Sequence, residues 1–191
     1  MRLRPNRTKR GSLTRAEPDG RESLGRSRGG LTTKIHLAAD LHWRPVVTST
    51  SPGQRAESVM FTEVLTMIRY PTSGPGRPRT RPSRVLADKA YSIRAIRVEL
   101  RRRHIVAVIP ERRDQRANRA RKGSAGGRPP AFDAEAYKDR NTAERCINKL
   151  KQHRAVATRY DKRDYLYRGT LHVASIRTWL RDLTSRSPDR P

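Results

Sequence analysis

Residues 132–153 constrain the fold most strongly, because this segment holds neither Gly nor Pro and repeats with the period of a helix. It follows the loop-forming sequence Arg128-Pro129-Pro130. Asp133 then stands where a carboxylate accepts hydrogen bonds from the free N–H groups of a first helical turn. An apolar stripe lets one side of the helix rest on a core, and it comprises Ala136, Ala143, Ile147 and Leu150. We therefore predict a helix over this segment.

A row of polar side chains lies beside this stripe, within roughly 60° on a helical wheel. The row consists of Tyr137, Arg140, Glu144 and Lys151. Two interpretations are open: the row faces a cleft and carries chemistry, or it is a solvated face with spaced ion pairs. Composition alone favours the second interpretation, because charged rows on helices usually face solvent.

The spacing of this row, Tyr-x2-Arg-x3-Glu-x6-Lys, resembles the signature of the DDE transposases that bacterial insertion sequences encode. Further blocks are similar to one subgroup of that family. They are GRSRGGLTTKIHLAAD at residues 25–40, VLADKAY at 85–91, GGRPPAFDAEAYKDRN at 126–141 and LKQHRAVATRYDK at 150–162. The similarity covers about residues 10–182 in the block order of the family.

The charge of the chain points independently to a polyanionic partner. The sequence holds 44 Lys and Arg against 18 Asp and Glu, a formal net charge of +26, and only 34% of its 191 residues are hydrophobic. Such a surface gains affinity by releasing counterions from phosphates, so DNA is the expected partner and an anionic membrane the weaker one. No transmembrane run or secretory signal is present, which predicts a cytoplasmic protein associated with the bacterial nucleoid. Acidic residues near the N-terminus count against a transit peptide.

Several regular elements can be predicted along the chain. Residues 1–30 are expected to form a disordered basic arm. Alternating side chains predict a half-buried strand at 31–39, paired in a hairpin with a strand at 45–51. Helical spacing predicts helices at 56–69, 92–103 and 163–183, and short apolar runs predict strands at 84–87 and 105–109, in a parallel βαβ unit. Residues 71–83 and 111–131 read as flexible basic linkers, and 184–191 as a tail. Cys146, the single cysteine, reads as a packing residue.

Asp88 is the second residue with a chemical case, because it closes a predicted buried strand. In open α/β sheets, ligands bind at the carboxyl ends of strands. The alternative is that Asp88 caps the short segment that begins near Tyr91. The sequence by itself leaves both roles open.

The resemblance implies an α/β, ribonuclease-H-like catalytic core in residues 31–183. Two Asp and one Glu of that core hold a pair of Mg²⁺ or Mn²⁺ ions, which serve to cut and join DNA at insertion-sequence ends and at the target DNA. By position, Asp88 resembles the second Asp and Glu144 the Glu, so both are expected as metal ligands and catalytic residues. Arg140 and Lys151 would position phosphates, and Tyr137 would stack or hydrogen-bond near the DNA.

The first Asp of the family has no counterpart in the sequence. Asp19 lies in a Pro-Asp-Gly turn and Asp40 in the hairpin connection, so neither ends a buried strand. The resemblance therefore implies an N-terminally truncated core that lacks its central strand. A homodimer is one way to cover the strand edges that this leaves unpaired. The alternative function is a catalytically inactive remnant that acts only as a basic DNA-binding protein. An unrelated basic structural protein is a third reading, and the ordered blocks argue against it.

Overall fold

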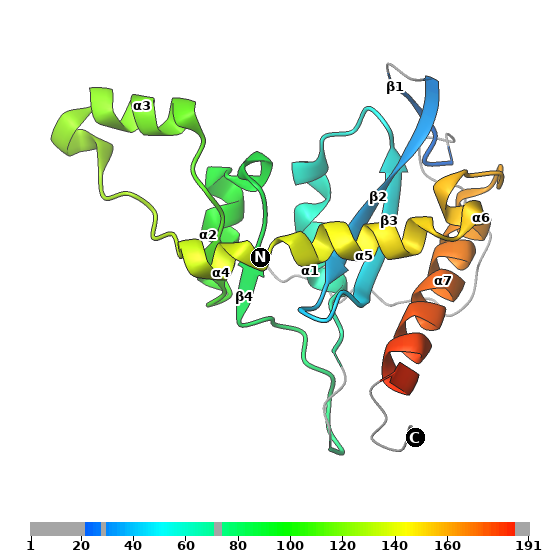
Figure 1. Cartoon of the computed structure of the whole chain (residues 1–191). Coiled ribbons are helices and arrows are strands. Elements are labelled where there is room, and N and C mark those ends of the chain that lie inside the picture. The colour runs from blue at the N-terminus through cyan, green and yellow to red at the C-terminus, as the bar shows by residue number, and fades with distance from the viewer. Residues whose placement is uncertain (1–21, 28–29, 71–73, 186–191) are drawn as a thin grey trace, which may run out of the picture.

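Two small sheets form the framework of the molecule (Figure 1). The computed structural model describes residues 22–27, 30–70 and 74–185. One sheet has the order β1-β2-β3 and is antiparallel, with β1 at Gly25–Ser27, β2 at Gly30–Ala39 and β3 at Pro45–Pro52. The other pairs β4, Arg84–Leu86, in parallel with β5, Val106–Val108. The α/β character predicted from the sequence is therefore confirmed.

The helices surround these sheets. They are η1 (Glu57–Met60), α1 (Phe61–Met67), η2 (Lys89–Tyr91), α2 (Arg94–Arg102), α3 (Arg113–Arg121), η3 (Gly123–Gly126), α4 (Ala134–Lys138), α5 (Asn141–Lys151), α6 (Arg154–Ala157) and α7 (Asp164–Ser185). The hairpin, the parallel βαβ unit and the final helix thus appear where their periodicity predicts them. The C-terminal tail from residue 186 onward and most of the predicted basic arm lie outside the described residues. Within the predicted arm, Gly25–Ser27 pairs with β2 as a strand.

The molecule has two apolar cores. One is formed around β4, α2 and β5 and contains Leu65, Ile96, Leu100, Ile105 and Ile109. The other lies where α5, α6 and α7 pack against the β2–β3 sheet and contains Leu150, Val156, Tyr167, Leu171 and Ala174. Each sheet therefore has its own core.

Strand β2 is half-buried as predicted, but helices also cover part of the face that alternation assigned to solvent. Ile35 and Leu37 pack against the core under α5 to α7. On the other face of the hairpin, Ser49 of β3, which pairs with His36, donates to Glu63 of α1 at 3.2 Å, and Lys34 of β2 forms an ion pair with Glu57 of η1. Helices η1 and α1 thus cover part of the side that alternation assigned to solvent.

His36 is the clearest case of this difference, since it is only 6% exposed. Its Nε2 lies 2.7 Å from the Ser51 hydroxyl, which is buried as well. Burial lowers the pKa of His36, partly offset by the nearby carboxylates of Glu57 and Glu63. The folded state therefore favours the neutral imidazole more than the unfolded chain does.

This histidine is expected to make the β2–β3 sheet less stable in mild acid. A folded pKa below the ordinary value of about 6.5 means that stability is full above that pH and is lost as the pH falls through it. Urea unfolding followed by tryptophan fluorescence, at about pH 7.5 and about pH 5.5, should show a smaller loss in His36→Gln than in the unmodified chain. His172→Gln, at an exposed position of α7, is the control and should keep the full loss. Equal losses in all three proteins would contradict this assignment.

The predicted helix over residues 132–153 is interrupted. Asp133 caps α4 as expected, accepting from the Ala136 N–H at 2.9 Å. Around Asp139 and Arg140, however, the backbone bonds close over three residues, as in the Arg140 N–H to Tyr137 carbonyl bond at 3.0 Å. Asp, Asn and Thr compete locally for backbone hydrogen bonds, and the sequence Asp139-Arg140-Asn141-Thr142 concentrates them here. The tightened turn separates α4 from α5.

The structure also departs from the linker predicted at 111–131. Helix α3 and the η3 turn occupy much of it, and none of the α3 residues is buried. Apolar periodicity could not reveal this helix, because its sequence RDQRANRAR contains no apolar side chain larger than Ala. It does contain good helix formers, chiefly Arg, Ala and Gln.

Candidate functional site

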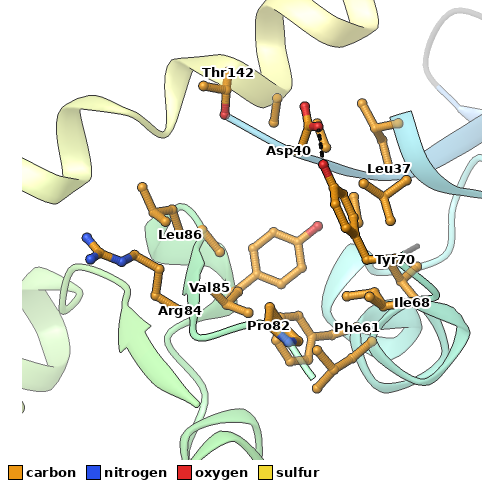
Figure 2. Close-up of a pocket in the computed structure, with 18 of the residues that line it drawn as sticks. Leu37, Asp40, Phe61, Ile68, Tyr70, Pro82, Arg84, Val85, Leu86 and Thr142 are labelled. Atoms are coloured by element: carbon orange, nitrogen blue, oxygen red, sulfur yellow. Dashed lines mark hydrogen bonds between the residues drawn. The ribbon is translucent and has the colours of Figure 1, made fainter. Parts of the chain in front are cut away.

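A cleft of about 1290 Å³ lies between the two sheets. Residues of β2, α1, β4 and the start of α5 line it (Figure 2). Its wall is largely apolar, and includes Leu37, Phe61, Ile68, Val85 and Leu86. Three polar residues of the sequence-predicted site, Asp88, Arg140 and Glu144, also line the cleft, which makes it the candidate site.

Asp88 lines the cleft just after β4. It is also the N-cap of η2, where its Oδ1 accepts from the N–H of Ala90 at 2.8 Å. The capping role that the sequence offered as an alternative is therefore present. It does not withdraw the residue from the cleft, because a carboxylate has a second oxygen and several lone pairs.

Glu144 lines the same cleft from the first turn of α5. Its Oε1 lies 2.8 Å from Nη1 of Arg140, which also lines the cleft. The Glu144 side chain is 53% exposed and that of Arg140 33% exposed. An ion pair this open to water contributes only about 0.3–0.5 kcal/mol, so either partner can be drawn away at little cost.

The other two residues of the predicted row are not among those that line the cleft. Tyr137 belongs to α4, before the tightened turn, and its ring packs against that of Phe132 with centroids 5.3 Å apart. Lys151 is the last residue of α5, exposed and two turns beyond Glu144. The structure therefore joins Arg140 and Glu144 in one site and leaves Tyr137 and Lys151 beside it.

The sequence did not predict a cluster around Arg44, of which two members, Asp40 and Tyr70, line the cleft. The Asp40 Oδ2 accepts from the Arg44 Nε at 2.7 Å and from the Tyr70 hydroxyl at 3.1 Å, the latter bond drawn in Figure 2. Oδ1 of Asp40 accepts from the backbone N–H groups of His42 and Arg44. The Arg44 guanidinium also lies 4.1 Å from the ring centre of Trp179 and 3.5 Å from Asp182.

These contacts assign Asp40 a structural role. Burial alone would raise the pKa of Asp40, but hydrogen bonds from Arg44 and the charge of that residue lower it overall. Both carboxylate oxygens are engaged within the hairpin and by Tyr70, so Asp40 holds Arg44 in place, and Arg44 in turn contacts Trp179 and Asp182 of α7. The i to i+4 spacing of Asp40 and Arg44 is visible in the sequence, whereas their neighbours Tyr70, Trp179 and Asp182 are too distant in the chain to be found that way.

The carboxylates of the cleft are the right type of ligand for a hard divalent cation, but they are too few to hold one firmly. Asp88 and Glu144 are carboxylates, the ligands that Mg²⁺ and Mn²⁺ prefer. Across residues 22–27, 30–70 and 74–185, however, no three His, Cys, Asp or Glu side chains are grouped closely enough to hold a metal ion. Cys146 offers no ligand, since it is fully buried and burial raises the pKa of its thiol to about 12. Its predicted role as a packing residue is confirmed.

No helix in the described part of the chain is both long and apolar enough to cross a membrane.

Comparisons with known proteins match most of the chain. The family described as "Transposase DDE domain" matches residues 11–175. A putative transposase for insertion sequence element IS6501 from Brucella ovis is 26% identical over 151 residues, which are 79% of this chain and all of that protein. No solved structure matches the chain.

Proposed function

The chain belongs to the DDE transposase domain family, and we propose that it forms part of the catalytic domain of an insertion-sequence transposase, which cuts DNA and joins the cut ends to a target. One observation carries the catalytic part of this proposal. Asp88 and Glu144, from segments far apart in the sequence, both line the cleft between the sheets. Carboxylates that line one cleft are the ligand type that a DNA-cutting site with hard cations requires, and these two would supply part of a set of three.

Asp88 and Glu144 would hold the divalent ions in this proposal, with two ions in a complete enzyme. Bound Mg²⁺ or Mn²⁺ supplies Lewis acidity, which activates a water or 3′-hydroxyl and neutralises the leaving oxygen. Arg140 lines the same cleft and would bind a phosphate of the DNA strand. Tyr137 and Lys151, beside the cleft, would contact the DNA farther along.

A ribonuclease-H-like core with an open centre is the finer part of the proposal. β2 pairs with β3 over Thr33 to Ala39, but β1 reaches its other edge only up to Thr32. Among the described residues, β4 pairs only with β5. Strands β2 and β4 both line the cleft. We infer that this cleft takes a strand that carries the first Asp, and that would join the two sheets into one. Alternatively, a second copy of the chain could pair with these edges of β2 and β4 in a homodimer.

A basic DNA-binding protein without catalysis is the second candidate function. The observation that favours it is the missing third carboxylate in the described part of the chain. Both candidates bind DNA and place the protein at the nucleoid, so DNA binding tests what they share. Cleavage of DNA that carries insertion-sequence ends, in Mg²⁺ or Mn²⁺, separates them.

The chain is expected to bind DNA with little sequence preference and with steep salt dependence. Each phosphate that it neutralises adds about 0.9 to the slope of log K against log salt. Five neutralised phosphates would give a slope of about −4.5 and a roughly 500-fold loss of affinity between about 50 and 200 mM salt. Fluorescence anisotropy with two unrelated duplexes of equal length measures both properties. A binding constant that does not change with salt concentration would refute the DNA-binding role.

A further inference from the structure

Helix α3 projects from the molecule at a distance from the β2–β3 sheet (Figure 1). None of its residues is buried, so apolar packing does not explain its position. A helix that is polar on all sides needs another source of stability, either side-chain bonds or a partner. The contacts of α3 include such side-chain bonds at its base, and the charges on its outer face indicate a partner.

Arg112 and Gln115 fix the base of α3 to the loop that follows Asp88. The Arg112 guanidinium donates to the carbonyls of Lys89 and Ala90, both at 3.1 Å. The side-chain amide of Gln115 bonds the carbonyl of Ser92 and accepts from its hydroxyl at 2.8 Å. Ser92 is only 1% exposed, so this anchor is built into the body of the protein. Any displacement of α3 would therefore act directly on the η2 loop.

The opposite face of α3 is cationic. Arg113, Arg116 and Arg121 are exposed and fall within roughly 140° on a helical wheel, with Ala117 and Ala120 between them. Small side chains between the arginines allow a phosphate backbone to approach the helix closely. The three cations extend over about 12 Å along the axis, at 1.5 Å per residue.

The charge around α3 is too one-sided to be explained by ion pairs within the protein. Residues 112–128 contain seven Arg or Lys and a single carboxylate, Asp114. Arg119 is paired with Glu111, on the face that points back toward the body. Arg113 and Arg116 are like charges one turn apart, a spacing that destabilises an isolated helix. A polyanion on the outer face would remove that repulsion.

We propose that α3 is a DNA-binding helix that takes the phosphate backbone of duplex DNA beside the cleft, and that Arg112 and Gln115 set its position relative to Asp88. The inference rests on the proposed function, because it assumes DNA as the partner. Since the base of α3 is bonded to residues 89–92, DNA held on its outer face would lie one helix diameter, roughly 10–12 Å, from the loop of the candidate metal ligand. The helix thereby guides the strand toward the site.

The test compares two triple variants. Arg113→Ala/Arg116→Ala/Arg121→Ala removes the outer cations of α3, and Ala keeps the helix because it has the highest helix propensity. Arg168→Ala/Arg177→Ala/Arg181→Ala removes the same charge from α7. We expect the α3 variant to lower the salt slope by up to about 2.7, which is 0.9 for each lost contact. The α7 variant should keep a slope near that of the unmodified chain.

Crosslinking supplies an independent readout. Because Cys146 is buried, Ala117→Cys adds a single accessible thiol to α3, to which a photoreactive group can be attached. Val173→Cys, at a position of α7 that is 68% exposed, is the matched control. DNA should crosslink to position 117 and not to 173. Equal crosslinking, or equal slopes in the two triple variants, would overturn the role of α3 while leaving the proposed function in place. Failure of the unmodified chain to bind DNA at low salt would overturn both.

Discussion

Glu144→Ala and Asp88→Ala are each expected to reduce metal-dependent DNA cleavage to background, but only in a preparation where the cleft is filled by a strand that ends in Asp. Mg²⁺ is held through few protein groups, so the loss of one carboxylate from a set of three is severe. Because the described residues hold no cluster of three possible metal ligands, the chain is expected to cleave nothing by itself. Strand and chain can be combined by fusing the strand upstream of Met1 or by adding it as a peptide.

Glu135→Ala is the matched control for this experiment. Glu135 lies on α4 close to the site in sequence, but its side chain is 82% exposed and pairs with Lys138. Cleavage of end-labelled DNA that carries insertion-sequence ends, resolved on a gel, should survive Glu135→Ala and disappear in the other two variants. Efficient cleavage by the chain alone, lost in Glu144→Ala, would show that its metal site is complete and would refute the open-core proposal.

The two cores are expected to unfold as separate units. Leu100 and Leu171 are both 0% exposed, one in each core. Truncating either to Ala should lower the free energy of unfolding of its own unit by about 2–5 kcal/mol. That is a large share of the roughly 5–15 kcal/mol that stabilises a typical domain. The cleft between the sheets limits how much of this loss reaches the other unit.

The positions of the two tryptophans make this result measurable. Trp43 lies in the β2–β3 turn and Trp179 on α7, so fluorescence reports only the unit with the antiparallel sheet. Far-ultraviolet circular dichroism reports both units. Leu171→Ala should shift the fluorescence transition in urea, while Leu100→Ala should leave it unchanged and shift part of the dichroism signal. A single transition that both variants shift equally in both signals would mean that the cores are coupled.

Sequence patterns predict the elements of this fold better than the contacts between them. The β2–β3 hairpin and the β4–α2–β5 unit follow from local periodicity, because turn residues and apolar spacing act within a few positions. The burial of His36 could not be predicted, since it depends on η1 and α1, which come later in the chain. The turn at Asp139 and Arg140 was hidden for another reason. Its backbone stays close to helical, and only the local competition of Asp, Asn and Thr tightens it.

The candidate site shows the same division. The spacing of Arg140 and Glu144 and the strand before Asp88 are local signals, and the structure brings these three residues to one cleft. Whether they act on DNA as the family resemblance implies stays a prediction. The position of Tyr137 outside the cleft depends on the break between α4 and α5, which a straight helical wheel cannot represent. The anchoring of α3 depends on Gln115 reaching Ser92, a contact across 23 positions.

The ion pair between Arg140 and Glu144 has a thermodynamic consequence for the proposed enzyme. A cation that takes Glu144 releases Arg140 for a DNA phosphate, and a phosphate that takes Arg140 releases Glu144 for the cation. Each ligand therefore removes the competitor of the other, and linkage requires the two gains in affinity to be equal. Without either ligand, Arg140 and Glu144 neutralise each other, so neither charge is unpaired in the free protein. Metal and DNA would then bind the protein cooperatively, because one ion pair between Arg140 and Glu144 is exchanged for a contact of each residue with its ligand.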